Sequence, residues 1–230
     1  MNNKKNVISL IIGYIGTVLS LFLLILLINP IYSLPVLIRM PLLIITYPLL
    51  FIVPFIMSLL NKDSFMDYGF SKAKIPLQIL LGLIFGIAFS FFFTLLPHMC
   101  GLGAWFSSGY TYSEWWQFVY EFAYSILGVA LTEELIFRGF FFIRCKKIFT
   151  VSENKKQIIS PDLAAIIISS VLFGLYHFMQ GNIFQVICTS FLGILFCLMR
   201  KIKNCTTLSV IITHGVYDAL IVVITSCLTK

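Results

Sequence analysis

The chain has 230 residues, of which 60% are hydrophobic and 11% charged, with a mean hydropathy of +1.00 and a formal net charge of +7. Soluble globular domains carry about 25% charged residues, so this composition excludes an ordinary soluble domain and predicts a polytopic membrane protein. The basic residues lie in short loops between apolar runs, where such residues orient a chain in the lipid bilayer. This distribution argues against a nucleic-acid partner.

Seven apolar stretches follow one another along the chain, and we predict that each is one membrane-spanning helix. The predicted fold is therefore all-α, a polytopic transmembrane bundle of about seven spans that forms a single domain over residues 1–230. Prolines interrupt the second stretch and are expected to bend it. In the third, Gly82, Gly86 and Ser90 recur every four residues and predict a small face for close helix packing. In chain order the stretches are 7–28, 40–60, 75–96, 118–143, 163–179, 183–199 and 208–228.

The loop charges predict the orientation of the bundle. If alternate loops lie on opposite sides, all of the 16 Lys and Arg residues except Arg39, Arg138 and Lys230 fall on the side of the N-terminus. Basic loops stay in the cytoplasm, so we predict a cytoplasmic N-terminus in a multi-pass integral membrane protein of the plasma membrane, if the source is bacterial. The six cysteines show no paired or metal-type spacing, which predicts neither disulfides nor a thiolate metal site.

Ionisable residues inside the apolar stretches are concentrated in the last four, so we interpret 1–97 as accessory spans and 118–228 as the functional core. The fourth stretch carries Glu133, Glu134 and Arg138. Charged groups at membrane depth cost about 2.5–3.5 kcal/mol each on insertion scales, so they are paired or functional. Glu134 and Arg138 are spaced for an ion pair along one helix. Glu133 is turned by about 100° from Glu134 around the helix and is free to act as a general base. The alternative is that the ion pair only stabilises the helix and that Glu133 is a further polar contact.

Two histidines extend this set. Phe173 and His177 share one face of the fifth stretch, and His214 and Asp218 share one face of the seventh. Each histidine alone could be a buried hydrogen-bonded residue, but unpaired polar groups are penalised in lipid, so together they should converge on one cavity. There, Glu133, His177 and His214 could bind a divalent metal such as zinc with an activated water, or activate water directly. Both alternatives predict hydrolysis.

Counting along the helices leaves one geometric conflict. At 1.5 Å per residue, His177 lies nearer the outer end of its helix than Glu133 and His214 lie on theirs. We therefore predict that the turn Gln180-Gly181-Asn182 is recessed in a water-accessible cavity. Irregular backbone at that depth is tolerated where it lines such a cavity.

Three motifs now resemble a known family. Glu133-Glu134-x-x-x-Arg138, Phe173-x-x-x-His177 and His214-x-x-x-Asp218 resemble, in order, those of the CAAX protease and bacteriocin-processing (Abi) family of intramembrane endopeptidases. The resemblance implies that Glu133 activates water and that both histidines bind metal or stabilise the oxyanion. It also implies that Glu134 and Arg138 shape the site and that Asp218, often asparagine in the family, orients or co-ligates.

The resemblance also implies the substrate, which is a peptide or membrane-protein segment. Eukaryotic members cleave a prenylated CAAX tail, and a leader or signalling peptide is expected in a bacterium. One alternative is a non-catalytic membrane scaffold or bacteriocin-immunity protein. Another is a proton-coupled transporter, since buried acids and histidines also form relays, although matching interrupted helices are missing from the two halves of the sequence.

Overall fold

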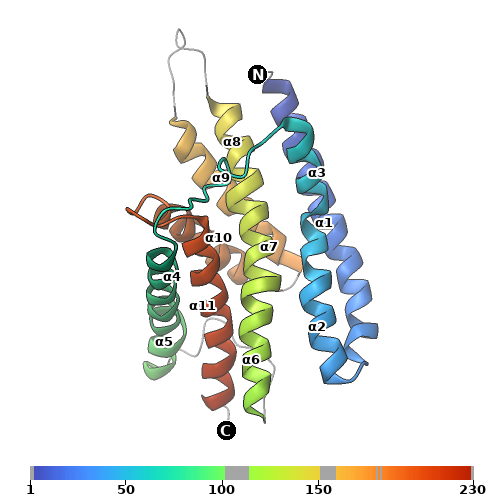
Figure 1. The fold of residues 1–230 in the computed structure, drawn as a ribbon, viewed down its shortest axis with the longest axis vertical. Helices are drawn as coiled ribbons and strands as arrows, with labels where there is room; N and C mark the ends of the chain where they lie inside the picture. The colour runs from blue at the N-terminus through green and yellow to red at the C-terminus, as the bar shows by residue number, and fades with distance from the viewer. Residues whose placement is uncertain (1–2, 102–113, 151–158, 180, 182, 229–230) are drawn as a thin grey trace.

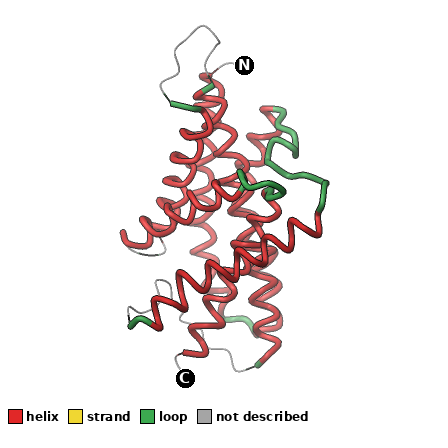
Figure 2. The backbone as a smooth tube through the Cα atoms, turned by 90° about the vertical axis from the view of Figure 1, so that its left-hand side faces the viewer, coloured by secondary structure: helices red, strands yellow, loops and turns green. Residues whose placement is uncertain are grey.

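The computed structural model describes residues 3–101, 114–150, 159–179, 181 and 183–228, and these residues form helices joined by loops (Figures 1 and 2). Within this part of the chain the helices form seven consecutive stretches, which confirms the all-α fold. The first three stretches comprise α1 (Asn3–Tyr32); α2 (Val36–Thr46), the 3₁₀ helix η1 (Tyr47–Phe51) and α3 (Ile52–Asn61); then α4 (Ile75–Ser90), the π-helix η2 (Phe91–Leu95) and α5 (Leu96–Met99).

The last four stretches contain the residues that the sequence marks as functional. The fourth is the longest and alternates between α- and π-helical turns. In chain order the elements are α6 (Trp115–Ala123), the π-helix η3 (Tyr124–Ala130), α7 (Leu131–Glu134), the π-helix η4 (Leu135–Phe141) and α8 (Phe142–Phe149); then α9 (Pro161–Tyr176) with the 3₁₀ turn η5 (His177–Met179), α10 (Ile183–Met199) and α11 (Thr207–Leu228).

Membrane-spanning length is reached by four apolar stretches among the described residues: Asn3–Tyr32, Val36–Asn61, Ile75–Met99 and Thr207–Cys227. The helices α9 and α10, in the fifth and sixth stretches, are apolar but shorter. In the second stretch, regular α-helix gives way to the 3₁₀ helix η1 around Pro48, which has no N–H to donate. Many large apolar side chains on the outward faces are exposed, as a lipid-facing surface requires.

The fourth stretch runs through the middle of the bundle (Figure 1). Helices α1, α2 and α3 lie on one side of it, and α4, α5, α10 and α11 lie on the other, with the chain termini at opposite ends. A cluster of buried aromatic side chains, including Phe137, Phe140 and Phe141, packs the fourth stretch against α1 and η1. The middle stretch is therefore held from both sides, and its Glu133, Glu134 and Arg138 are buried within the protein.

A buried ion-pair cluster also joins the first half of the chain to the fourth stretch. Asp63, just after α3, pairs with Arg144 and with Lys147, whose Nζ lies 2.8 Å from Oδ1 of the aspartate. Arg144 also donates to the Asn6 amide oxygen on α1 at 2.9 Å. Asp63 and Arg144 are fully buried, so each needs its partner. These contacts tie α1 and α3 to α8 at the N-terminal end of the bundle.

The small face of α4 packs against α11, as its glycine spacing predicts. Thr213 of α11 donates its hydroxyl to the Gly82 carbonyl oxygen at 3.1 Å. A Cβ on Gly86 would lie 2.7 Å from the Val216 Cβ, so the two helices approach more closely than any larger residue allows. This contact places α11, with its histidine, beside the middle stretch.

Gly82→Val is expected to lower the free energy of unfolding by about 1–3 kcal/mol, the usual range for overpacking. Its Cβ would lie 2.6 Å from the Ile212 Cβ and 2.8 Å from the Ser209 carbonyl oxygen. Thermal unfolding in detergent measures the effect, and Ile84→Val on the exposed face of α4 is the control. Equal melting temperatures for the two variants would contradict the close packing.

Candidate active site

The two adjacent glutamates lie on a short α-helical segment between two π-helical segments. Glu133 and Glu134 end α7, which has η3 before it and η4 after it. Isolated π-helical turns are rare and often occur at functional sites. Each widens the helix by an extra residue and so alters the direction in which later side chains point. Both glutamates are buried, with exposed fractions of 1% and 0%.

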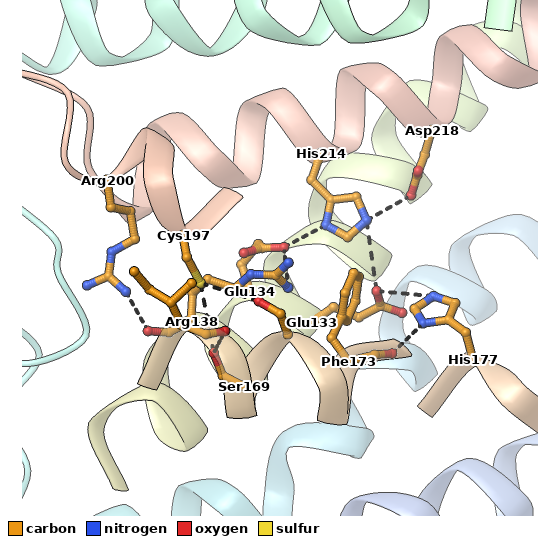
Figure 3. Close-up of polar contacts among 12 residues, drawn as sticks. Glu133, Glu134, Arg138, Ser169, Phe173, His177, Cys197, Arg200, His214 and Asp218 are labelled. Atoms are coloured by element: carbon orange, nitrogen blue, oxygen red, sulfur yellow. Dashed lines mark hydrogen bonds and ion pairs between the residues drawn. The ribbon is translucent and has the colours of Figure 1, made fainter. Parts of the chain in front are cut away.

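Glu133 faces the two histidines with one of its carboxylate oxygens (Figure 3). Its Oε2 lies 3.9 Å from His177 Nε2 and 3.8 Å from His214 Nε2, and it accepts no hydrogen bond from the described residues. Its Oε1 accepts a hydrogen bond from the hydroxyl of Tyr47 in η1, at 2.6 Å. The two oxygens of this carboxylate therefore have different surroundings.

Glu134 points to the other side of the helix and meets two cationic or donor groups. Its Oε1 lies 3.1 Å from Arg138 Nη1, the ion pair predicted by the spacing, and 2.8 Å from His214 Nδ1. The Arg138 guanidinium lies over the rings of Phe173 and Phe196, with 4.2 Å and 5.0 Å from Cζ to the centroids. Glu134 and Arg138 therefore hold the His214 ring rather than reach the cavity.

Both imidazoles are anchored through Nδ1, and the Nε2 atoms converge. His177 Nδ1 lies 2.9 Å from the Phe173 carbonyl oxygen, which can only accept, so this nitrogen carries the proton. His214 Nε2 lies 3.3 Å from Asp218 Oδ2, one helical turn further along α11. The structure therefore brings all six predicted site residues together, with Asp218 next to His214.

A cavity of about 420 Å³ opens at this cluster. Glu133, His177, His214 and Asp218 line it, so the candidate reacting groups share one hollow inside the bundle. The other walls combine apolar side chains from α1 and α11 with polar side chains from η3 and α10, namely Leu21, Leu24, Ile25, Ile28, Ile221, Val222, Ser125, Gln185 and Thr189. Such a cavity fits an apolar or amphipathic chain that presents a polar group at one point.

The predicted metal ligands do not form a metal centre as the side chains stand. In the part of the chain that the structure describes, no group of three or more His, Cys, Asp or Glu side chains is arranged to hold a metal ion. His214 has the Glu134 carboxylate beside Nδ1 and the Asp218 carboxylate beside Nε2. The chemistry proposed below uses these side chains and water, and zinc at Glu133, His177 and His214 stays an untested alternative.

Sequence reasoning missed the aromatic residues that surround Glu133. Tyr47 lies in the second stretch, within the range interpreted as accessory, and its hydroxyl lies 3.4 Å from that of Tyr176. Neither tyrosine carries a sequence signal, since this residue is common in membrane helices. Tyr176 directly precedes His177 in the sequence, and in the structure the two rings contact each other edge-to-face.

The end of α9 explains how His177 reaches Glu133 and His214, although counting along the helices places it nearer the outer end. The α-helix ends at Tyr176, and His177 begins a 3₁₀ turn whose ring still reaches Glu133. The predicted recess of the following turn is not tested, because Gln180 and Asn182 lie outside the described residues, and Gly181 is exposed. The convergence of the three side chains therefore depends on the turn at His177 itself.

These features define a class: a helical membrane protein with a buried cluster of glutamate and histidine that opens onto an internal cavity. Residues 115–220 match the family model described as type II CAAX prenyl endopeptidase, Rce1-like, and this segment of the chain is similar to that family. The matched segment contains all three motifs, which confirms the resemblance, and a match to this family implies a peptidase. No curated protein and no solved structure matches the chain.

Proposed function

We propose that the protein is an intramembrane endopeptidase in which Glu133 activates water for attack on a peptide bond. The observation that carries this proposal is the position of Glu133 Oε2, a buried carboxylate oxygen that lacks a hydrogen-bond partner among the described residues and faces both Nε2 atoms. An unpaired acid at this depth is costly, and a role in chemistry explains why it is kept.

The distances suit one water molecule between the three groups. Separations of 3.8 Å and 3.9 Å are too long for direct hydrogen bonds, which span about 2.5–3.2 Å, but short enough for one oxygen to contact both atoms. In its neutral form His177 carries its proton on Nδ1, so Nε2 can accept one hydrogen of this water. Glu133 accepts the other hydrogen, which leaves an oxygen lone pair directed at the substrate.

The reaction then balances with groups already in the site. Glu133 takes a proton from water as the water oxygen bonds to the scissile carbonyl carbon, and the carbonyl oxygen becomes negatively charged. His214, as an imidazolium, stabilises this oxyanion through its Nε2–H, while Glu134 holds the ring at Nδ1. Glu133 returns the proton to the amide nitrogen as the C–N bond breaks, which releases an acid and an amine.

The cavity walls suggest a substrate with an apolar segment. Leu24 and Ile25 of α1 face the cavity together with Ile221 of α11, so an apolar side chain or lipid chain would be accommodated next to the polar cluster. We propose a leader peptide, signalling peptide or membrane-protein segment as the substrate, with a prenylated CAAX tail as the other candidate. We also propose that the N-terminus faces the cytoplasm, from the distribution of Lys and Arg.

The test uses the purified full chain in lipid nanodiscs. One fluorogenic probe is a peptide with a farnesylated CAAX tail, and a second is an unmodified apolar leader peptide. Labelling of new amino termini in membranes of cells that express the protein identifies native cleavage without assuming a sequence. Cleavage that needs the protein supports the proposal, whereas a protective or signalling phenotype without any new terminus would favour the non-catalytic scaffold.

Metal removal is expected to leave the rate unchanged. The proposed steps use only Glu133, His177 and His214, so dialysis against EDTA or 1,10-phenanthroline should not lower the turnover of either probe. Metal analysis of the dialysed protein provides the control for complete removal. A loss of activity that added Zn²⁺ restores would contradict the metal-free mechanism and make these three residues a zinc site.

A further inference from the structure

The Glu133 carboxylate is held by a tyrosine from outside the segment that matches the family. Tyr47 lies in η1, whereas the match covers residues 115–220. Its hydroxyl donates to Glu133 Oε1 at 2.6 Å, and only 8% of the residue is exposed. A short hydrogen bond from a buried donor to a carboxylate belongs to the stronger class of such bonds. The second stretch of the chain therefore reaches into the candidate active site.

This hydrogen bond distinguishes two oxygens that are otherwise equivalent. The terminal torsion of a glutamate is broad and roughly two-fold, so an unsupported carboxylate can turn either oxygen, or neither, toward the histidines. With Oε1 bonded to Tyr47, Oε2 faces His177 and His214 at 3.9 Å and 3.8 Å. We propose that Tyr47 is a positioning residue, whose phenol fixes the Glu133 carboxylate in the orientation that water activation needs. This inference rests on the proposed peptidase function.

The tyrosine is itself rigidly supported. It begins the 3₁₀ helix that forms around Pro48, a residue with a fixed φ, and this helix packs against α7. Its ring meets the Tyr124 ring edge-on, with 6.0 Å between centroids, and its hydroxyl lies 3.4 Å from that of Tyr176. Groups held by packing on this kind of support keep a functional side chain in place. It follows that residues 115–220 alone would lack part of the catalytic arrangement.

Tyr47 could instead be only a core residue, and one substitution separates the two roles. Tyr47→Phe keeps the ring and its packing and removes only the hydroxyl. Small misplacements of a reacting group cost up to about 10²-fold in rate. For the full chain in nanodiscs with the farnesylated and leader probes, we expect kcat to fall about 10- to 100-fold. KM should stay unchanged and the protein should still fold, with a melting temperature lowered only by the loss of one hydrogen bond.

Tyr14→Phe provides the matched control. It makes the same chemical change on α1, where the ring packs edge-on against Phe141 with 5.8 Å between centroids, away from Glu133. It should cleave at the wild-type rate.

A wild-type kcat for Tyr47→Phe overturns the inference. So does a raised KM with unchanged kcat, or a loss of folded protein, since either assigns Tyr47 to substrate binding or packing. If wild-type protein cleaves neither probe and generates no new amino termini in membranes, the proposed function fails and this inference fails with it. If wild-type protein cleaves and Glu133→Gln cleaves equally well, Glu133 is not the base, so this inference fails while the peptidase function stands.

Discussion

Glu133→Gln is expected to reduce cleavage of both probes by about 10²- to 10⁴-fold, the usual contribution of a general base. Glutamine keeps the shape of the side chain and an amide oxygen that can accept the Tyr47 hydrogen bond, so the fold should persist. It has no basic oxygen for the water proton, which removes the first chemical step. Initial rates at saturating probe measure the effect. Both proteins are purified, and each is used only if it elutes as a folded species in size-exclusion chromatography.

Glu114→Gln is the control for this substitution. Glu114 begins the same long helical stretch as the cap of α6, is exposed, and does not line the cavity. The same change of charge there should leave the rate within about twofold of the wild type, because exposed charges contribute little. A Glu133→Gln variant that cleaves within tenfold of the wild type would assign the base to another group.

The sequence identifies the reacting residues because the bilayer makes them conspicuous. A soluble enzyme carries many buried and exposed acids, whereas here only Glu121, Glu133, Glu134 and Asp218 lie within the predicted apolar stretches. The i, i+4 spacing also correctly predicts two contacts, Glu134 with Arg138 and His214 with Asp218. Helical periodicity fixes neighbours on one helix, so contacts of this kind follow from sequence alone.

Contacts between helices do not follow from that reasoning. Tyr47 and Glu133 are 86 residues apart, and nothing in either local pattern indicates that the two stretches pack together. The contact of Glu134 with His214 joins residues 80 positions apart and is equally non-local. The π-helical turns around α7 also cannot be predicted from a period of 3.6 residues per turn. They add residues to the helix without any change in amino-acid composition that would mark them.

The position of His177 relative to Glu133 and His214 is also not predictable from the sequence alone. Counting 1.5 Å per residue from the ends of the predicted spans assumes parallel helices that start at one level. The real position of His177 depends on where α9 ends and how it packs against α8 and α10, which are tertiary features. Sequence reasoning therefore predicts that Glu133, His177 and His214 share one cavity, but neither the individual contacts between helices nor the backbone arrangement that brings these side chains together.

Arg138→Met is expected to lower the free energy of unfolding by about 3–5 kcal/mol, because it removes one partner of a buried ion pair. Both members are almost fully buried, with exposed fractions of 1% for Arg138 and 0% for Glu134. The variant would leave the Glu134 carboxylate with only the His214 ring as a partner among the contacts seen here. Reversible unfolding of the detergent-solubilised protein measures the loss. Arg39→Met, at a half-buried arginine that donates to the Tyr32 carbonyl oxygen, should cost about 1 kcal/mol or less.

The double variant Glu134→Gln/Arg138→Met separates the free-energy cost of an unpaired buried charge from the contribution of the ion pair to stability. Removing both charges relieves the unpaired carboxylate, so the double variant should be more stable than Arg138→Met alone. Its cleavage rate should remain below that of the wild type, because a neutral glutamine no longer supports the imidazolium form of His214. The proposed oxyanion contact uses this form. If the double variant unfolds at least as easily as Arg138→Met, Arg138 stabilises the bundle mainly through its contacts with the rings of Phe173 and Phe196. The ion pair would then serve the histidine rather than the fold.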